Sequence, residues 1–343
     1  ISQKEYYQFF SFFNTIDESG LYSYFTPSVP TPTLLMSNDA AKEQIDAAKK
    51  IAENEAAELA KIRQAAEESF AKWLNDRPTE VALPGQLGYY PFDEYKDGKL
   101  SNLLSDSNRA SSSSKNKIVP GKNGNALQLT GDDGVNLGVG NFKRTQPFSV
   151  ALWMNTPHHK ERTVVFSRSK AWTDAGSRGY QMLLRDGHLS TSLIHFWPGN
   201  AINIRTTAKL PKNEWHHVTI TYDGSTRAGG LAIYVDGKPA ETEIHKDNLY
   251  KNITGGGNDH IVIGQRFRDV GFAKGLVDDF RVFDRELTAA EVAQLHDGQA
   301  LAKLLAKPAD ALGQAERDAL RSYYFATANE SHTKQLTKLR AAR

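Results

Sequence analysis

Residues 86–286 alternate apolar and polar side chains with a period of two, the pattern of half-buried β-strands. Turn signals such as Asp186-Gly187 and Asp236-Gly237 separate the runs. Many short strands joined by turns, without helical segments between them, predict an antiparallel β-sandwich or barrel. The expected strands are 87–92, 125–130, 147–155, 162–168, 180–185, 188–196, 214–222, 230–236, 260–264 and 274–284.

Helical patterns flank this β-rich stretch on both sides. Residues 38–76 are rich in Ala, Glu and Lys, and their apolar residues repeat every seven positions, as in a coiled coil. The stripe consists of Ile45, Ala52, Leu59, Ile62, Ala66 and Trp73. Residues 288–343 begin with the capping box Thr288-x-x-Glu291. Two interpretations stay open: the segments pack on each other as an antiparallel stalk, or each pairs with other parts of a longer protein.

Residues 1–37 are expected to be the remnant of a preceding domain. Tyr6, Phe9 and Phe10 recur at helical spacing, which predicts a short helix over 1–20, and three prolines then predict an extended segment. The N-terminus lacks the basic and apolar regions of a signal peptide. We therefore expect a fragment or a processed form.

Composition excludes several classes of function. The chain has 42 Lys and Arg against 40 Asp and Glu, a net charge of +2, and no basic run, so no nucleic-acid partner is expected. It has no Cys, which excludes disulfides, thiol nucleophiles, Cys-ligated zinc and covalently attached c-type haem in this chain. No stretch approaches the roughly 20 apolar residues of a membrane span.

Seven segments in order match motifs of a known family. They are LGYYPFDE, NALQLTGDDGVNLG, PFSVALWMN, EWHHVTITYDG, LAIYVDGKP, IVIGQ and GLVDDFRVFDRELTAAEV. Over residues 86–297 the chain resembles the laminin-G-like, concanavalin A-like jelly roll. This resemblance implies a jelly-roll sandwich at 86–286 that binds a ligand, with polysaccharide as the expected class.

The flanking sequences resemble a second group of proteins. ISQKEYYQFFSFFNTIDESGLY and the following TPSVPTPTLL are similar to the end of the domain that precedes such a sandwich in planctomycete cytochrome-type multidomain proteins. This resemblance implies an exported bacterial protein, periplasmic or extracellular, whose partners include other domains of a larger parent protein.

Aromatic and planar polar side chains gather in the sequence between 168 and 200. Such residues are typical of carbohydrate sites, where aromatic faces contact the sugar rings and planar polar groups bind their hydroxyls. A loop tryptophan is a better candidate than one within a strand. The predicted ligand-binding residues are Arg168, Trp172, Arg178, Tyr180, His195, Trp197 and Asn200.

Asp278 is expected on the inward face of its strand, because the other members of that face, Leu276, Phe280 and Val282, are apolar. A buried carboxylate needs a partner. Related jelly rolls carry a structural calcium here, which implies an ion held by Asp278 and backbone carbonyls near Phe92 and Asp93. The alternative is an aspartate satisfied by backbone N–H groups at the corner.

No catalytic residues are predicted, although a glycoside hydrolase stays an open alternative. Retaining hydrolysis needs two carboxylates about 5 Å apart, whereas the acidic pairs here, such as Asp278-Asp279, are adjacent and point to opposite faces of a strand. His216-His217 cannot chelate one metal for the same reason. We expect a non-catalytic binding module, with a structural spacer or protein-interaction domain as the other alternative.

Overall fold

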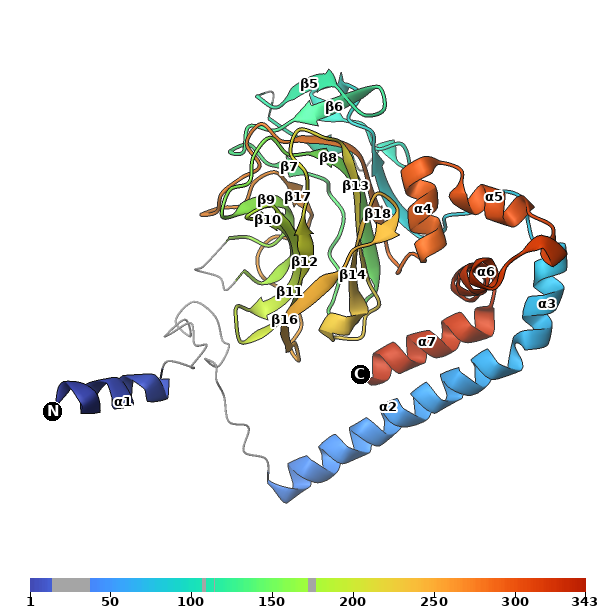
Figure 1. The fold of residues 1–343 in the computed structure, drawn as a ribbon, viewed down its shortest axis with the longest axis horizontal. Coiled ribbons are helices and arrows are strands. Elements are labelled where there is room, and N and C mark those ends of the chain that lie inside the picture. Colours follow the sequence, from blue (N-terminus) through green and yellow to red (C-terminus); the bar gives the residue numbers. More distant parts are fainter. Residues whose placement is uncertain (14–37, 107–108, 114, 172–176) are drawn as a thin grey trace.

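The computed structural model describes residues 1–343 except 14–37, 107–108, 114 and 172–176 (Figure 1). Two antiparallel sheets pack face to face as a β-sandwich, which confirms the predicted jelly roll with helices at both ends. None of the described helices is long and apolar enough to cross a membrane.

One sheet has eight strands in the order β15-β14-β13-β8-β18-β6-β5, with β1 also paired to β18. Its strands are β1 (Gln86–Tyr90), β5 (Lys117–Pro120), β6 (Asn125–Gln128), β8 (Phe148–Asn155), β13 (His216–Tyr222), β14 (Leu231–Val235), β15 (Lys238–Pro239) and β18 (Leu276–Phe283). Every pairing within it is antiparallel. The helices of the C-terminal part lie on the side of this sheet (Figure 1).

The other sheet has ten strands in the order β16-β12-β11-β10-β9-β17-β7-β4-β3-β2. Its strands are β2 (Tyr95–Lys96), β3 (Lys99–Leu100), β4 (Ala110–Ser111), β7 (Val135–Asn136), β9 (Thr163–Arg168), β10 (Gly179–Arg185), β11 (His188–Phe196), β12 (Asn200–Lys209), β16 (Thr242–Asn248) and β17 (Val262–Ile263). Six of these strands were not predicted: the two-residue strands β2, β3, β4 and β7, and the longer strands β12 and β16, which lie together at one edge of the sheet.

The core lies between the two sheets and consists of the side chains that alternation turns inward. Phe148 on β8 is fully buried, with its ring centroid 4.8 Å from that of Phe142 and 4.6 Å from that of Tyr180. Tyr180, Met182 and Leu184 fill the inner face of β10. Each fully buried aromatic or aliphatic side chain contributes roughly 1.5–3 kcal/mol of transfer free energy.

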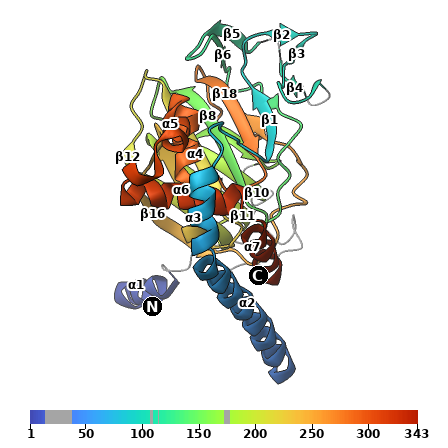
Figure 2. The same cartoon turned by 90° about the vertical axis from the view of Figure 1, so that its right-hand side faces the viewer.

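The helices at the two ends of the chain contact each other. α2 (Asp39–Ala65) and α7 (Glu330–Ala342) lie antiparallel, since Gln335 Nε2 donates to Glu55 Oε2 over 2.6 Å and Arg63 Nε donates to His332 Nε2 over 3.1 Å. α3 (Glu67–Asp76), α5 (Ala300–Ala306) and α6 (Gln314–Thr327) lie near one another (Figure 2), and their side chains form a second apolar core. That core includes Phe70, Leu74, Leu301, Leu305, Leu320, Tyr323 and Tyr324.

α4 (Ala289–Asp297) joins the helices to the sandwich. Its N-terminus carries the predicted capping box, in which Thr288 and Glu291 bond reciprocally. Val292 packs with Phe283 and Leu287, so α4 is held to the end of β18. The helices are therefore connected to the eight-stranded sheet by apolar contact as well as by the chain.

The expected single long helix with a continuous seven-residue stripe is wrong in two respects. The helix divides at Ala66, which separates α2 from α3. In addition, Leu59 is buried but Ile45 is 48% exposed. The reason is length: α2 has 27 residues and spans about 40 Å, whereas α7 has 13 and spans about 20 Å, so α7 covers only the C-terminal half of α2.

The predicted helix at 1–20 is described only in part, as α1 (Gln3–Phe13). Its aromatic side chains Tyr6 and Phe10 are 57% and 53% exposed. The predicted extended segment and the rest of the flanking resemblance fall largely within 14–37, outside the described residues.

Candidate functional site

One end of the ten-stranded sheet carries four of the predicted ligand-binding residues. β10 starts, β11 ends and β12 starts at this end, because consecutive antiparallel strands reverse direction. Arg178 immediately precedes β10, His195 is near the end of β11, Asn200 opens β12, and Trp197 lies in the turn between β11 and β12. The topology therefore brings together residues that are 22 positions apart in sequence.

Hydrogen bonds hold a neighbouring loop against this end. Arg178 Nε donates to the His195 carbonyl over 3.3 Å, and the His195 ring bonds through Nδ1 to the Asn252 carbonyl over 2.6 Å. Asn200 Oδ1 accepts from the backbone N–H groups of Tyr250 and Lys251 at 3.2 and 3.3 Å. These bonds fix the backbone of the loop next to the strand ends.

The polar side chains at this end are partly enclosed, and two aromatic residues remain open to solvent. Burial lowers the pKa of His195, as do Arg178 and Lys251, so its imidazole is neutral at pH 7. Tyr250 is 41% exposed and Trp197 is half-buried. We define the rim site as Arg178, His195, Trp197, Asn200 and Tyr250.

Two predicted ligand contacts, Arg168 and Tyr180, lie in the interior instead. Both side chains are fully buried, and Tyr180 donates its hydroxyl to the Gly140 carbonyl over 2.6 Å. Arg168 donates to the Ile253 carbonyl over 2.7 Å and pairs with Asp259 at 3.1 Å. Tyr180 therefore belongs to the core, and Arg168 anchors the loop that carries Tyr250 from beneath.

Trp172, the remaining predicted contact, lies outside the described residues. Tyr250 was missed by the sequence prediction, because the loop after β16 approaches β11 and β12 only in the folded chain. No local pattern at Tyr250 indicated that approach.

A polar row on the outer face of the ten-stranded sheet was also missed. Gln181, Ser192 and Asn203 are paired in register across β10, β11 and β12. Ser192 Oγ accepts from Gln181 Nε2 at 3.3 Å and from Asn203 Nδ2 at 2.8 Å, and Arg266 Nη1 donates to Gln181 Oε1 over 2.7 Å. All four are buried, so the row stiffens the strands behind the rim site. The alternation of side chains in YQMLLR and HLSTSLIHF could have indicated that Gln181 and Ser192 lie on the outer face of the sheet.

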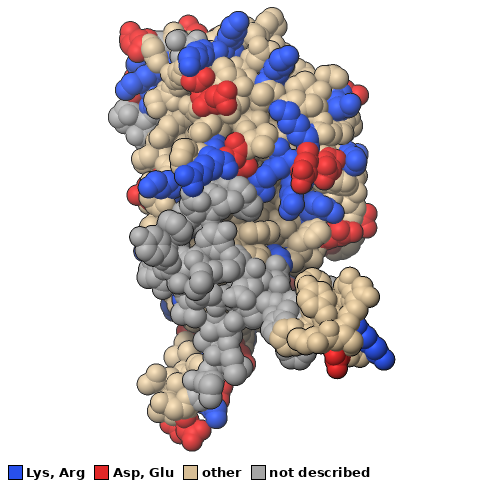
Figure 3. Space-filling view, turned by 90° about the vertical axis from the view of Figure 1, so that its left-hand side faces the viewer, with Lys and Arg blue, Asp and Glu red and all other residues tan. Residues whose placement is uncertain are grey.

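The surface on this side of the sandwich carries Lys and Arg side chains interspersed with Asp and Glu (Figure 3). A mixed distribution of this kind gives no extended field of one sign. It fits a neutral ligand as well as a charged one.

Asp278 is buried, as its strand pattern predicted, and caps the turn between β5 and β6. Its Oδ2 accepts from the backbone N–H groups of Lys122 and Asn123, both at 2.9 Å. Burial raises the pKa of Asp278 to about 7, and the charge of Asp279 adds to the rise, while the two N–H groups oppose it. The neighbouring Asp279 has φ 48°, at a bulge where β18 shifts register against β8.

Some of the oxygens proposed to bind calcium at Asp278 already accept hydrogen bonds. N–H groups occupy Oδ2, and the Asp93 carbonyl already accepts from Asn125 Nδ2 at 3.0 Å. Calcium prefers six to eight oxygen ligands, and the described residues hold no cluster of three or more His, Asp or Glu side chains. Backbone N–H groups thus satisfy Oδ2 of Asp278, whereas its buried Oδ1 has no hydrogen-bond partner among the described residues, and structural calcium stays a prediction for chelation to test.

The comparisons with known proteins agree with this architecture. Residues 129–293 match the family model Laminin_G_3, described as the concanavalin A-like lectin/glucanases superfamily, which confirms the resemblance seen in the motifs. No curated protein matches the chain.

Several solved structures are similar in fold. The binding domain of Paraclostridial Mosquitocidal Protein 1 is 16% identical, with a TM-score of 0.49, over 66% of this chain and 53% of that one. Domain 4 of AbnA, a GH43 extracellular arabinanase from Geobacillus stearothermophilus in complex with arabinotriose, is 20% identical, with a TM-score of 0.43, over 62% of this chain and 98% of that one. The chain thus spans about half the length of the first structure.

Proposed function

Because residues 129–293 match the concanavalin A-like lectin and glucanase superfamily, we propose that this sandwich is a non-catalytic module that binds a polysaccharide at the rim site. The observation that carries the proposal is the pairing of two solvent-accessible aromatic residues, Trp197 and Tyr250, with a hydrogen-bonded polar frame at one end of the ten-stranded sheet. We also propose that the protein is exported, where it would meet such a ligand.

The rim site has the chemistry that sugar recognition requires. The apolar face of a pyranose packs on an aromatic ring, and its hydroxyls bond to planar polar groups such as Arg and His side chains. Here the polar groups are held by intramolecular bonds, such as that from His195 to the Asn252 carbonyl, before any ligand arrives. Preorganisation of this kind lowers the entropic cost of binding.

Affinity electrophoresis against a panel of neutral and acidic polysaccharides tests the proposal, with titration calorimetry for any that retards the protein. We expect Tyr250→Ala and Trp197→Ala each to weaken binding about tenfold, which corresponds to about 1.4 kcal/mol. The matched control is Tyr7→Ala, which removes an aromatic side chain that is 58% exposed on α1. No retardation of the wild type, or wild-type affinity in both rim variants, would overturn the rim site as a glycan site.

The same panel separates binding from hydrolysis. Incubation of each polysaccharide with the wild type, followed by an assay for new reducing ends, should give no signal above buffer. Release of reducing sugar would contradict the non-catalytic part of the proposal and favour the glycoside hydrolase alternative.

A spacer or protein-interaction role is the second candidate, and one observation favours it. The N-terminal half of α2 extends beyond α7 and exposes Ile45 and Ile51, which are 48% and 55% accessible. Exposed apolar residues on a projecting helix suit contact with other domains of a longer parent protein. If the wild type binds no polysaccharide, this reading replaces the first.

A further inference from the structure

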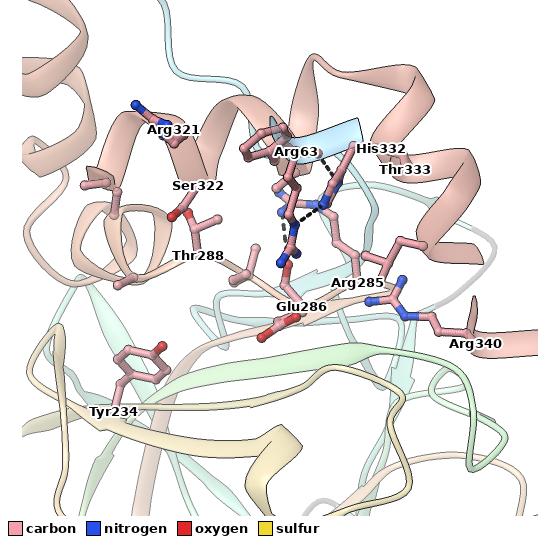
Figure 4. Close-up of a pocket in the computed structure, with 17 residues that line it drawn as sticks. Arg63, Tyr234, Arg285, Glu286, Thr288, Arg321, Ser322, His332, Thr333 and Arg340 are labelled. Carbon is pink, nitrogen blue, oxygen red and sulfur yellow. Dashed lines mark hydrogen bonds between the residues drawn. The ribbon is translucent and has the colours of Figure 1, made fainter. Parts of the chain in front are cut away.

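A cavity of about 540 Å³ lies where the helices meet the sandwich (Figure 4). Tyr234 and Glu286 of the sandwich line one side of the cavity. Arg63 of α2, with His332 and Arg340 of α7, lines the helical side. Pockets of 300–1,000 Å³ commonly hold small molecules. The cavity lies on the side of the eight-stranded sheet and is distinct from the rim site.

Two arginines face the cavity in fixed orientations. Arg63 Nε donates to His332 Nε2 over 3.1 Å, and Arg340 Nε donates to the Asp223 carbonyl over 2.7 Å. In the described part of the chain, no hydrogen bond or ion pair engages the Nη groups of either residue. Figure 4 shows both guanidinium groups directed toward Glu286. Their terminal donors are therefore available to a ligand.

His332 holds Arg63 in place with an uncharged imidazole ring. Because its Nε2 accepts from Arg63, the ring proton is on Nδ1, which donates to the Phe325 carbonyl over 3.1 Å. Burial and the charge of Arg63 lower the pKa of His332. The imidazole thus orients Arg63 without adding positive charge.

Glu286 is the one acidic residue among the described residues that line the cavity. Enclosure by the packed elements raises its pKa to about 7, the charge of Asp223 adds to the rise, and Arg340 and Arg63 oppose it. Within the described residues it forms no ion pair with either arginine, although its surface is open to the cavity. Below pH 7 the cavity therefore has a neutral acid beside the cations Arg63 and Arg340.

We propose that this cavity binds a small oxyanion, a carboxylate or a sulfate or phosphate group, between Arg63 and Arg340. The planar guanidinium fork matches two oxygens of such a group, and charge-assisted bonds of this type are stronger than neutral ones. Protonated Glu286 can donate a further hydrogen bond to the anion. Since the arginines come from α2 and α7 and Glu286 comes from the sandwich, the ligand joins the helices to the sandwich.

Ionisation of Glu286 makes the affinity of the site for an anion depend on pH. Above pH 7 its carboxylate repels an anion, so affinity falls as pH rises. The charged and titratable groups that face Glu286 from the surrounding elements are Arg63, Asp223, Tyr234, Arg285, Arg321, His332 and Arg340. A fall with rising pH is therefore assigned to Glu286 only if substitution of Glu286 removes it.

Titration calorimetry of the full chain with sodium sulfate and sodium glucuronate tests the proposal and separates the two anion classes. At pH 6 we expect binding of at least one, weakened about tenfold or more in Arg63→Gln and Arg340→Gln. The control Arg109→Gln removes an arginine that pairs with Asp97 and Asp106 at the surface, and should leave affinity unchanged.

Glu286→Gln keeps the argument testable if an arginine variant fails to fold. It should bind sulfate equally at pH 6 and 8.5, whereas the wild type should bind about tenfold more weakly at pH 8.5. Sulfate keeps its charge over this pH range, so a change in its affinity comes from ionisation of the protein. Absence of binding by both anions to the wild type at pH 6, or equal pH dependence in Glu286→Gln, would overturn the proposal.

Discussion

Replacement of Asp278 by Asn measures what the buried carboxyl does for stability. The wild-type pKa is raised from 3.8 to about 7, so the folded state binds a proton more tightly than the unfolded state. A carboxyl of this kind contributes stability that is present near pH 4 and lost as pH rises toward 7. The rise of this pKa from 3.8 to about 7 corresponds to a loss on the order of 4 kcal/mol.

Asp278→Asn removes the ionisation and keeps an oxygen for the N–H groups of Lys122 and Asn123. The free energy of unfolding of the variant relative to wild type should therefore rise between pH 4 and 8. The variant should be the more stable protein at pH 8, by up to about 4 kcal/mol. Asp278→Ala also removes the ionisation but leaves the N–H groups of Lys122 and Asn123 without their acceptor, so it should be about 2–4 kcal/mol less stable than Asp278→Asn at every pH.

Urea unfolding followed by tryptophan fluorescence at pH 4, 6 and 8 gives these values. Asp132→Asn, an exposed aspartate in a turn, is the control whose difference from wild type should stay flat with pH. A variant less stable than wild type at pH 8, or a chelator that lowers the wild-type midpoint, would refute the reasoning. Either result would mean that Asp278 needs its negative charge, as a calcium ligand does.

Two further substitutions test the backbone and the helical core. Gly179→Ala should destabilise the sandwich by at least about 3 kcal/mol, because at φ 139° a Cβ would lie 1.7 Å from the Arg168 carbonyl oxygen; thermal unfolding against Gly229→Ala, where the space is open, measures this. Leu305→Ala, in the helical core, should destabilise the protein by about 2–5 kcal/mol. On heating this variant, the helical circular dichroism should be lost at a lower temperature than the near-ultraviolet signal of the sandwich.

The β-sandwich could be predicted because the inner face of each strand is filled by large apolar side chains, which therefore recur at every second position. The same alternation placed Asp278 inside. It also placed Tyr180 with Met182 and Leu184 on the inner face of β10, and the prediction of Tyr180 as a ligand contact overlooked that signal. By contrast, β16 is a mostly exposed edge strand, TEIHKDN, whose charged residues suit an unpaired edge and show no apolar period.

The composition of the rim site could be predicted only in part. Arg178, His195 and Asn200 follow from strand order, since turns bring strand ends together. Tyr250 and the approach of its loop depend on buried contacts such as that between Arg168 and the Ile253 carbonyl, which are 85 positions apart. The cavity at Arg63 and Arg340 depends on a helix pairing across still longer separations, which a local pattern cannot specify.

The contact of α2 with α7 joins positions about 280 residues apart, as in the bond from Gln335 to Glu55. During synthesis α2 leaves the ribosome before the partner helix exists, and an isolated helix of such composition is only marginally stable in water. The pairing also requires closure of a loop that contains the entire sandwich, at an entropic cost that a folded sandwich reduces by shortening the distance between the two ends. Order in the C-terminal half of α2 should consequently appear last in refolding.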